Sequence, residues 1–404
     1  MNPHLSRLQP YPFERLRQLF STVTPNPAYT PISLGIGEPR HPTPALIKDA
    51  YCDAIQNTAG LAGYPATAGD VALRSSIASW LNRRYRITVS ASNQILPING
   101  SREALFAFAQ TVINAVGTSA EQPYVVCPNP FYQIYEGAAY LSGAQAYFVN
   151  SDPARNFAQD WDTVPPEVWK STQLLFVCSP GNPAGAVMPL NEWAKLFALS
   201  DRYGFVIASD ECYSEIYFRD EPPLGALEAA AKLGRADYKN VVTFSSLSKR
   251  SNVPGMRSGF CAGDAALIAQ FLLYRTYHGS AMSPVVQAAS IAAWNDEAHV
   301  VENRAQYRAK FAQITPMLSA VMDVALPDAG FYLWAGVRGS DADFARDLLA
   351  TYNVTVLPGS YLARDTATGN PGAGRIRMAL VAQNTECLEA AQRIVQFVQS
   401  RTST

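Results

Sequence analysis

The sequence predicts an α/β fold in which a large domain, built on a mostly parallel β-sheet between helices, is joined to a smaller α+β domain. Three observations support this prediction. The chain has 404 residues, more than the ~250–300 residues at which a single hydrophobic core stops growing. Strand and helix signals alternate after a proline-rich opening, and the pattern changes near Pro284. We therefore expect residues 46–285 to form the large domain, and residues 1–45 with 286–404 to form the small one.

The expected strands of the large domain are short apolar runs that end in polar residues. They occupy residues 94–98, 124–128, 174–180, 205–211 and 241–246. Continuous apolar runs of this kind are typical of parallel strands that are buried on both faces. Residues 99–101 indicate a turn, and residues 102–116 have apolar side chains at helical spacing. Because ligands bind outside the carboxyl ends of such strands, the polar residues there are expected to gather in one site.

The C-terminal part of the chain has a different pattern. Residues 285–322 predict one long helix that crosses into the small domain. Residues 330–337 and 374–381 are strand-like, and residues 363–375 form a glycine-rich loop. This combination predicts a separate α+β unit.

Composition and charge favour a small-molecule ligand. The chain has 32 basic and 33 acidic residues, a formal net charge of −1, so nothing attracts nucleic acid or a membrane surface. No apolar run approaches the ~18 residues of a membrane span, and the N-terminus lacks the apolar core of a secretory signal. Six scattered cysteines without CxxC spacing predict neither a metal site nor a disulfide framework. We expect a cytoplasmic protein.

The most informative residue is Lys249, which lies in a loop of small residues between two apolar runs, with Arg257 shortly after it. A lysine amine can react with an aldehyde, and a guanidinium matches phosphate oxygens. This pairing is typical of pyridoxal phosphate chemistry, in which the same lysine then moves a proton. The hydroxyls of Ser246 and Ser248 are further candidates to bind the phosphate. An isolated lysine is usually a solvated surface residue, and Arg257 alone fits a surface ion pair equally well.

Other polar residues offer the remaining contacts that such a cofactor needs. Asp210 ends an expected strand, where its carboxylate can keep the ring nitrogen protonated, although a helix cap explains it equally well. Tyr213 and Asn182 are candidates for hydrogen bonds to the ring oxygen. Their alternatives are core packing for the tyrosine and a simple turn residue for the asparagine.

Three further positions complete the candidate site. Ser101 and Arg102 open an expected helix, whose free N–H groups bind anions, but most helices begin in a similar way. Tyr132 can stack on the cofactor ring or pack in the core. Arg377, within a strand-like run, is a candidate for a substrate α-carboxylate; a structural salt bridge is the alternative, and Arg375 is the rival residue.

These residues occur in the order and approximate spacing of the fold-type I pyridoxal phosphate enzymes. The chain resembles the class I/II aminotransferases of the aspartate aminotransferase superfamily over nearly its whole length. The resemblance depends on the motifs GIGEP around Gly37, GYPATAG around Tyr64, NGSREALF, SPGNPAG, SDECY and SLSKRSNVPGMRSGF.

The resemblance also assigns roles within the candidate site. It implies that Ser101 and Arg102 give backbone contacts to the phosphate and that Tyr132 stacks on the ring. It implies that Gly37 lies near the substrate carboxylate. Tyr64 is implied to reach the phosphate of the other subunit's cofactor, which means a homodimer with shared active sites.

A narrower resemblance links the N-terminal segment and GIGEPRHPTPALI to bacterial N-succinyldiaminopimelate aminotransferases of the lysine pathway. It implies amino transfer between glutamate and N-succinyl-2-amino-6-oxopimelate. The family's usual GEPDF is here GEPRH, with Arg40 and His41, which indicates either a different distal substrate group or surface variation. Other candidates for contacts to that distal group are Tyr11, Arg275, Tyr277 and Ser280.

Other functions use the same residues. Amino transfer to aspartate or another amino acid needs them, and so does a β-elimination that breaks a carbon–sulfur bond. Pyruvate release from cystathionine without an oxo acid would indicate such a lyase. A cofactor-binding regulator or inactive relative is a third hypothesis. Regulators of this kind carry a DNA-binding domain fused to the fold, whereas this sequence starts almost directly with the enzyme-like region, and Lys249 and Asp210 are both present, which disfavours this hypothesis.

Overall fold

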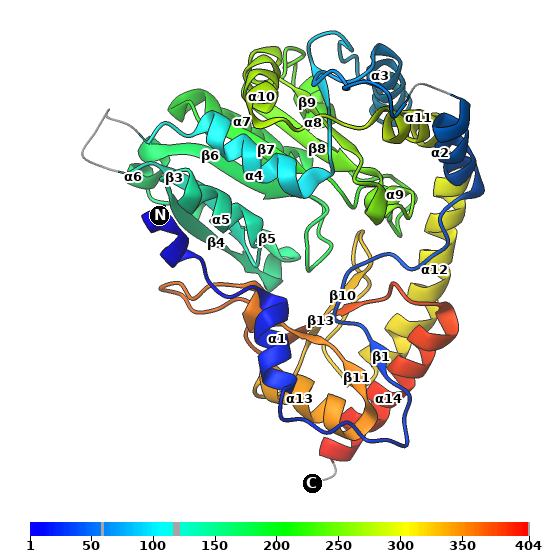
Figure 1. Ribbon diagram of the computed structural model, residues 1–404. Coiled ribbons are helices and arrows are strands. Elements are labelled where there is room, and N and C mark those ends of the chain that lie inside the picture. Colours follow the sequence, from blue (N-terminus) through cyan, green and yellow to red (C-terminus); the bar gives the residue numbers. More distant parts are fainter. Residues whose placement is uncertain (58–59, 116–121, 403–404) are drawn as a thin grey trace.

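The computed structural model describes residues 1–57, 60–115 and 122–402. Figure 1 shows two parts, one built on an eight-stranded sheet and the other on a three-stranded sheet. The large sheet spans residues 95–263 and the small one residues 332–379. The domain bounds expected from the sequence, 46–285 and 1–45 with 286–404, stay a prediction. In the part of the chain described, no helix is long and apolar enough to cross a bilayer.

The large sheet is mostly parallel, as the sequence predicts. Its strands, in spatial order, are β2 (Ile95–Ile98), β9 (Gly259–Gly263), β8 (Val241–Ser246), β7 (Val206–Asp210), β6 (Thr172–Cys178), β3 (Tyr124–Asn129), β4 (Gln145–Asp152) and β5 (Ala158–Gln159). The strands from β8 to β4 pair in parallel, whereas β9 and β5 are antiparallel to their neighbours. The carboxyl ends of the parallel strands therefore meet at one edge.

Helices cover both faces of this sheet because alternate strand residues point to opposite sides. In β6, Leu174 and Phe176 lie in one core and Leu175 and Val177 in the other. The first core is covered by α4 (Ser101–Val112), α5 (Ile134–Leu141) and α10 (Ala265–His278). The second is covered by α2 (Ala45–Asn57), α3 (Val71–Tyr85), α6 (Pro166–Ser171), α7 (Leu190–Tyr203), α8 (Ala226–Lys232) and α11 (Pro284–Asn295).

The small domain has its own core around a three-stranded antiparallel sheet. Strand β13 (Arg375–Ala379) lies between β10 (Tyr332–Gly336) and β12 (Leu357–Pro358). The N-terminal strand β1 (Ile32–Ser33) pairs in parallel with β11 (Val354–Thr355), which ties the start of the chain to this domain. The remaining helices are α1 (Pro12–Phe20), α12 (Ala298–Ser319), α13 (Asp341–Tyr352) and α14 (Asn384–Thr402), and in Figure 1 α12 runs from beside α2 to α14.

Short helical turns complete the fold. They are α9 (Leu247–Arg250) and the 3₁₀ turns η1 (Pro3–Arg7), η2 (Pro153–Arg155), η3 (Trp161–Thr163), η4 (Pro254–Met256) and η5 (Gly359–Leu362). Several helices begin directly after a residue whose side chain caps them. Asp70 accepts a hydrogen bond from Ala72 N–H at α3, and Asp264 accepts one from Ala266 N–H at α10.

The structure corrects two expectations about the elements. The single helix expected over residues 285–322 is divided into α11 and α12, because Asp296 is extended and Arg250 binds the carbonyls of Ala293 and Asp296 that would continue the helix. The helix expected over residues 102–116 ends at Val112, and residue 116 lies outside the described residues. Strands β4 and β5 were not predicted, and the sequence indicated β9 only as the apolar run after Lys249.

Candidate active site

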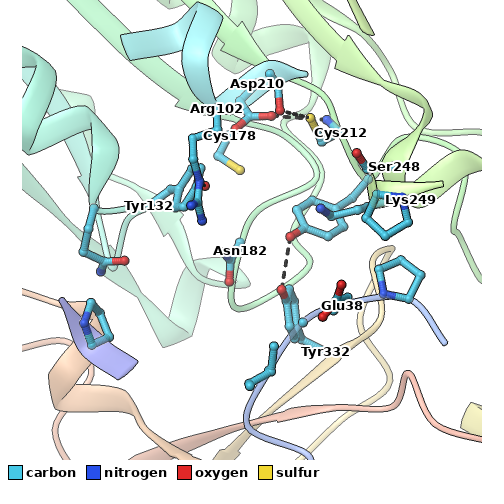
Figure 2. Close-up of a pocket in the computed structure, with 18 of the residues that line it drawn as sticks. Glu38, Arg102, Tyr132, Cys178, Asn182, Asp210, Cys212, Ser248, Lys249 and Tyr332 are labelled. Carbon is cyan, nitrogen blue, oxygen red and sulfur yellow. Dashed lines mark hydrogen bonds between the residues drawn. The ribbon is translucent and has the colours of Figure 1, made fainter. Parts of the chain in front are cut away.

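A cavity of about 470 Å³ lies between the carboxyl ends of the large sheet and the small domain. Its wall includes Asn182 after β6, Asp210 at the end of β7 and Lys249 just after β8. Arg377 comes from β13 of the small domain. Figure 2 shows Lys249 and Tyr132 on opposite sides of the cavity, with Asn182 between them.

Most of the residues expected from the sequence line this cavity. They are Gly37, Ser101, Arg102, Tyr132, Asn182, Asp210, Tyr213, Ser248, Lys249, Arg257 and Arg377. Residues widely separated in the sequence are therefore brought together as the strand-end argument predicts.

Two expected residues do not line the cavity. Ser246 is buried as the N-cap of α9: its hydroxyl accepts from Ser248 N–H and donates to the Ser258 carbonyl, both at 3.1 Å. These contacts cap the short helix that carries Lys249, and the role of Ser246 at the phosphate stays a prediction. Tyr64 is fully exposed on the surface of the single chain.

Asp210 is a buried carboxylate whose hydrogen bonds, within the described residues, come from neutral donors. Tyr135 donates its hydroxyl to Oδ2 at 2.8 Å, and Cys212 N–H donates to Oδ1 at 3.3 Å. Burial raises the pKa of Asp210, while these donors and the charge of Lys249 oppose the increase. A carboxylate in this setting gains most from a cationic partner, which fits the protonated ring nitrogen of a pyridine.

An anion site lies at the beginning of α4. Gly100 caps this helix with a φ of 85°, and a Cβ built there would lie 2.2 Å from Nη2 of Arg257. Only glycine leaves room for the guanidinium beside the free N–H groups of Ser101 and Arg102. Arg257 is itself held by a hydrogen bond from Nη1 to the Pro254 carbonyl at 2.9 Å. This cradle fits a phosphate.

Arg377 lies on the other side of the cavity and has an exposed fraction of 3%. Its Nη1 donates to Asn182 Oδ1 and its Nη2 to the Gly35 carbonyl, both at 3.0 Å. Its guanidinium lies 4.3 Å from the centre of the Tyr332 ring. Within the described residues, Nε lacks a partner and no carboxylate pairs with this cation. The site therefore fits a substrate carboxylate.

Several residues at the site escaped the sequence reasoning. Tyr332 donates to or accepts from the Tyr213 hydroxyl at 3.1 Å, a contact drawn in Figure 2. A Cβ at Gly37 would lie 1.9 Å from the Tyr332 hydroxyl, which explains the need for glycine. Neither Tyr332 nor Tyr135 belongs to a recognised motif, so no sequence signal indicated them.

Two cysteines also line the cavity. Cys178 ends β6, and Cys212 donates its thiol to Ser101 Oγ at 3.0 Å. Burial raises the pKa of both thiols, so they stay neutral. Their positions at strand ends were a usable signal, but the sequence reasoning tested cysteines only as metal or disulfide candidates.

Among the candidates for the distal substrate group, Tyr11 lines the cavity, and its hydroxyl accepts from Arg102 Nη2 at 3.4 Å. Arg102 also donates from Nε to the Tyr132 hydroxyl. Within the described part of the chain, no carboxylate pairs with Arg102, so its charge faces the cavity between two phenols. Arg102 is thus a candidate for the distal group through its side chain, which the sequence reasoning had not considered.

The other distal candidates do not line the cavity. Arg40 forms a surface ion pair with Glu386, and Arg275 is fully buried against Glu103. The Ser280 carbonyl accepts from Arg275, and Tyr277 is exposed. His41 is buried in hydrogen bonds to Asn303 and Lys310, away from the cavity.

The family model described as Aminotransferase class I and II matches residues 29–394. The chain belongs to this family. A crystal structure of an aminotransferase from Neisseria meningitidis Z2491 is 54% identical with a TM-score of 0.94, and the match covers 98% of this chain and 100% of that one.

Two other relatives extend the comparison. The LL-diaminopimelate aminotransferase of Nitratidesulfovibrio vulgaris (strain DP4) is 32% identical over 398 residues, which are 97% of this chain and 98% of the relative. The aminotransferase AspB of Helicobacter pylori 26695 is 33% identical with a TM-score of 0.88, over 97% of this chain and 99% of that one.

Aminotransferases of this family depend on pyridoxal phosphate. When bound, this cofactor supplies an aldehyde that takes up the amino group and a ring that withdraws electrons from the substrate. The geometry fits it at three points: an amine at Lys249, a buried carboxylate at Asp210 and the cradle of Arg257 at α4.

Proposed function

We propose that this aminotransferase moves an amino group between glutamate and N-succinyl-2-amino-6-oxopimelate, giving 2-oxoglutarate and N-succinyl-LL-2,6-diaminopimelate. The observation that carries the proposal is that two guanidinium groups of the cavity, besides Arg257 at the proposed phosphate site, have no carboxylate partner among the described residues; they are those of Arg377 and Arg102. Glutamate, 2-oxoglutarate and the succinylated compounds each carry an α-carboxylate next to the amino or oxo group that reacts. Each also carries a second, distal carboxylate. The resemblance of the N-terminal segment supports the same substrate.

In this proposal, Arg377 binds the α-carboxylate together with the amide of Asn182, and Gly37 leaves space beside it. Lys249 binds the cofactor aldehyde and, once released by the incoming amine, carries a proton to and from the substrate α-carbon. The partial exposure of Lys249 into the cavity is consistent with this role. Asp210 keeps the ring nitrogen protonated.

The remaining roles concern the cofactor's outer atoms. Tyr213 and Asn182 are proposed to hydrogen-bond the ring oxygen, and Tyr132 to stack on the ring. Ser246, Ser248 and Arg257 are proposed to bind the phosphate, with the backbone N–H groups of Ser101 and Arg102.

We also propose a homodimer with shared active sites in the cytoplasm. Tyr64 has no place in the cavity of its own chain and is fully exposed, as expected of a residue that reaches the partner's phosphate. Mixing Lys249→Ala with Tyr64→Ala chains tests this idea: mixed dimers contain one site with neither substitution, so activity should reappear. Recovery of no activity from a demonstrated mixed dimer would contradict the shared site.

A second candidate reaction uses LL-diaminopimelate itself, because the relatives that share about a third of their residues with this chain bear that name. Transfer to aspartate or another amino acid, and carbon–sulfur lysis, use the same central residues. A panel of donors separates them. The holoenzyme is mixed with N-succinyl-LL-diaminopimelate, LL-diaminopimelate, aspartate, an aromatic amino acid or cystathionine, and the bound cofactor's absorbance and the oxo acid product are followed.

We expect the succinylated donor to have the highest kcat/KM. Preference for free LL-diaminopimelate would assign the second candidate reaction, and preference for aspartate would exclude both lysine-pathway substrates. Pyruvate release from cystathionine without an oxo acid acceptor would indicate a lyase.

A further inference from the structure

A buried chain of hydrogen bonds connects the small domain to the backbone of Lys249. Lys310 Nζ donates to His41 Nε2 at 2.7 Å, and His41 Nδ1 contacts Asn303 Oδ1 at 2.8 Å. Asn303 Nδ2 in turn donates to the carbonyls of Lys249 at 3.2 Å and Arg250 at 3.4 Å. This chain of hydrogen bonds therefore ends on the short helix that carries the reactive amine.

The helix α12 explains how these groups meet. Asn303, Tyr307 and Lys310 recur at helical spacing, so they share the face of α12 that lies against His41. The His41 ring packs on Tyr307 with centroids 4.5 Å apart. Lys310 and Asn303 are almost fully buried, and so is His41, at 5% exposure.

In this chain of hydrogen bonds, each donor has an acceptor. Asn303 Nδ2 uses both hydrogens on two carbonyls, so Oδ1 must accept, from His41 Nδ1–H and from Asn252 Nδ2 at 3.0 Å. His41 is then neutral, with Nε2 accepting from Lys310. The three ammonium hydrogens of Lys310 go to His41, to the Leu380 carbonyl at 3.2 Å and to the Ala382 carbonyl.

The protonation states agree with the burial of these groups. Burial lowers the pKa of His41, which favours the neutral ring. Burial also lowers the pKa of Lys310, to about 8, which leaves it charged at neutral pH. A charged lysine with no carboxylate partner in the described residues depends on its three acceptors, so each of them is held in place.

We propose that His41, whose ring Lys310 helps to hold, is a positioning residue for Lys249: it orients the carboxamide of Asn303, which fixes the backbone of the helix that carries the reactive amine. This inference rests on the proposed role of Lys249. It gives a function to His41, one of the two positions at which the chain departs from the family's GEPDF motif. It also makes the location of the amine depend on where the small domain sits.

Arg250 offers a competing way to hold the same segment. Its guanidinium donates to the Ala293 carbonyl at 2.8 Å and pairs with Glu297 at 2.7 Å. If Arg250 alone fixed the helix, loss of the His41 contacts would lower only the stability of the fold. An experiment must therefore measure the environment of Lys249 itself.

Two substitutions of His41 each keep one of its two hydrogen bonds and remove the other. The amide nitrogen of His41→Asn can replace Nδ1 and donate to Asn303, but it cannot reach Lys310. The amide oxygen of His41→Gln can replace Nε2 and accept from Lys310, but it leaves Asn303 without this donor. Tyr307→Phe is the matched control, because it removes a buried hydroxyl that lacks a partner beside the same ring.

The readout is the pH midpoint at which the absorbance of the lysine-bound cofactor changes in each holoenzyme, together with kcat, the KM for glutamate and the melting temperature. In His41→Gln we expect a midpoint shifted by about half a pH unit or more and kcat lower by about three- to tenfold at nearly constant KM. His41→Asn and Tyr307→Phe should retain the wild-type midpoint, although His41→Asn should melt at a lower temperature.

The double variant His41→Phe/Lys310→Met covers the case in which His41→Gln does not fold. It removes the buried charge together with its acceptor, and it must shift the midpoint in the same direction. Unchanged midpoints in both His41→Gln and the double variant, with only the melting temperature lowered, would overturn the inference. A wild-type holoenzyme without any lysine-bound cofactor signal would instead contradict the proposed role of Lys249.

Discussion

The substitution Arg377→Lys tests the proposed carboxylate site most sharply. The change keeps the positive charge but removes the planar fork, so one ammonium must replace donors that now reach Asn182 Oδ1 and the Gly35 carbonyl, each at 3.0 Å. Because the guanidinium is only 3% exposed, water cannot replace the lost contacts. Loss of one hydrogen bond to a charged group costs about 1.5–3 kcal/mol, which corresponds to a ~10- to ~150-fold lower kcat/KM for glutamate.

The matched control is Arg375→Lys on the same strand. Arg375 pairs with Asp323 at 3.0 Å and does not line the cavity. Because Arg375→Lys disturbs only a partly exposed ion pair, it should cost about 0–1 kcal/mol, and kcat/KM should fall by less than about fivefold. The assay is a single-turnover reaction with glutamate, followed by the cofactor absorbance, with circular dichroism to verify the fold. Near-normal kcat/KM in Arg377→Lys, or a larger loss in Arg375→Lys, would refute the assignment.

Three further substitutions probe other parts of the account. Gly37→Ala places a methyl group 1.9 Å from the Tyr332 hydroxyl, so we expect about 1–3 kcal/mol lower unfolding free energy and a higher KM for glutamate; urea unfolding and steady-state kinetics measure both. Arg102→Leu removes the cation between Tyr11 and Tyr132, and it should lower kcat/KM for donors with a distal carboxylate by about tenfold or more but leave alanine nearly unaffected. Lys310 has a folded-state pKa of about 8, below its ordinary value of 10.5. Between pH 8 and 10.5 the unfolded chain therefore binds more protons than the folded one, so the unfolding free energy should rise with pH in this range. Lys310→Met should lack this increase when both proteins are unfolded by urea at several pH values.

Each of these has a clear contrary result. Unchanged stability in Gly37→Ala would mean that Tyr332 does not occupy the position described. Equal losses for glutamate and alanine in Arg102→Leu would assign its side chain to the cofactor or the fold. Identical pH profiles for wild type and Lys310→Met would show that the buried lysine does not titrate in this range.

The sequence predicted the fold well where buried strands end in polar residues. The runs at β6, β7 and β8 are short, mostly apolar and polar at their carboxyl ends, so buried parallel strands were predicted there, and they pair in parallel. Strand β9 was recognised only as an apolar run and not as a strand, because its glycines carry little strand propensity and its place between β2 and β8 depends on long-range pairing. The break between α11 and α12 was missed because it is stabilised by Arg250, a residue distant in sequence.

In the site, as in the fold, local sequence patterns were predictable and long-range contacts were not. Residues in motifs at strand ends, such as Asp210 and Lys249, were found, whereas Tyr135 and Tyr332 act through contacts that no local pattern records. A hydroxyl near the lysine fits both a phosphate ligand and a helix cap; the structure shows the cap made by Ser246, and its contact with the phosphate stays a prediction. The role inferred for His41 likewise depends on a contact made across hundreds of residues, to Asn303.

The most direct test of the central claim is a stoichiometric reaction of the holoenzyme with glutamate. We predict that the absorbance of the lysine-bound cofactor disappears, that one 2-oxoglutarate forms per active site, and that N-succinyl-2-amino-6-oxopimelate restores the original spectrum. Lys249→Ala should show no such cycle. A wild-type spectrum that glutamate leaves unchanged would contradict the account.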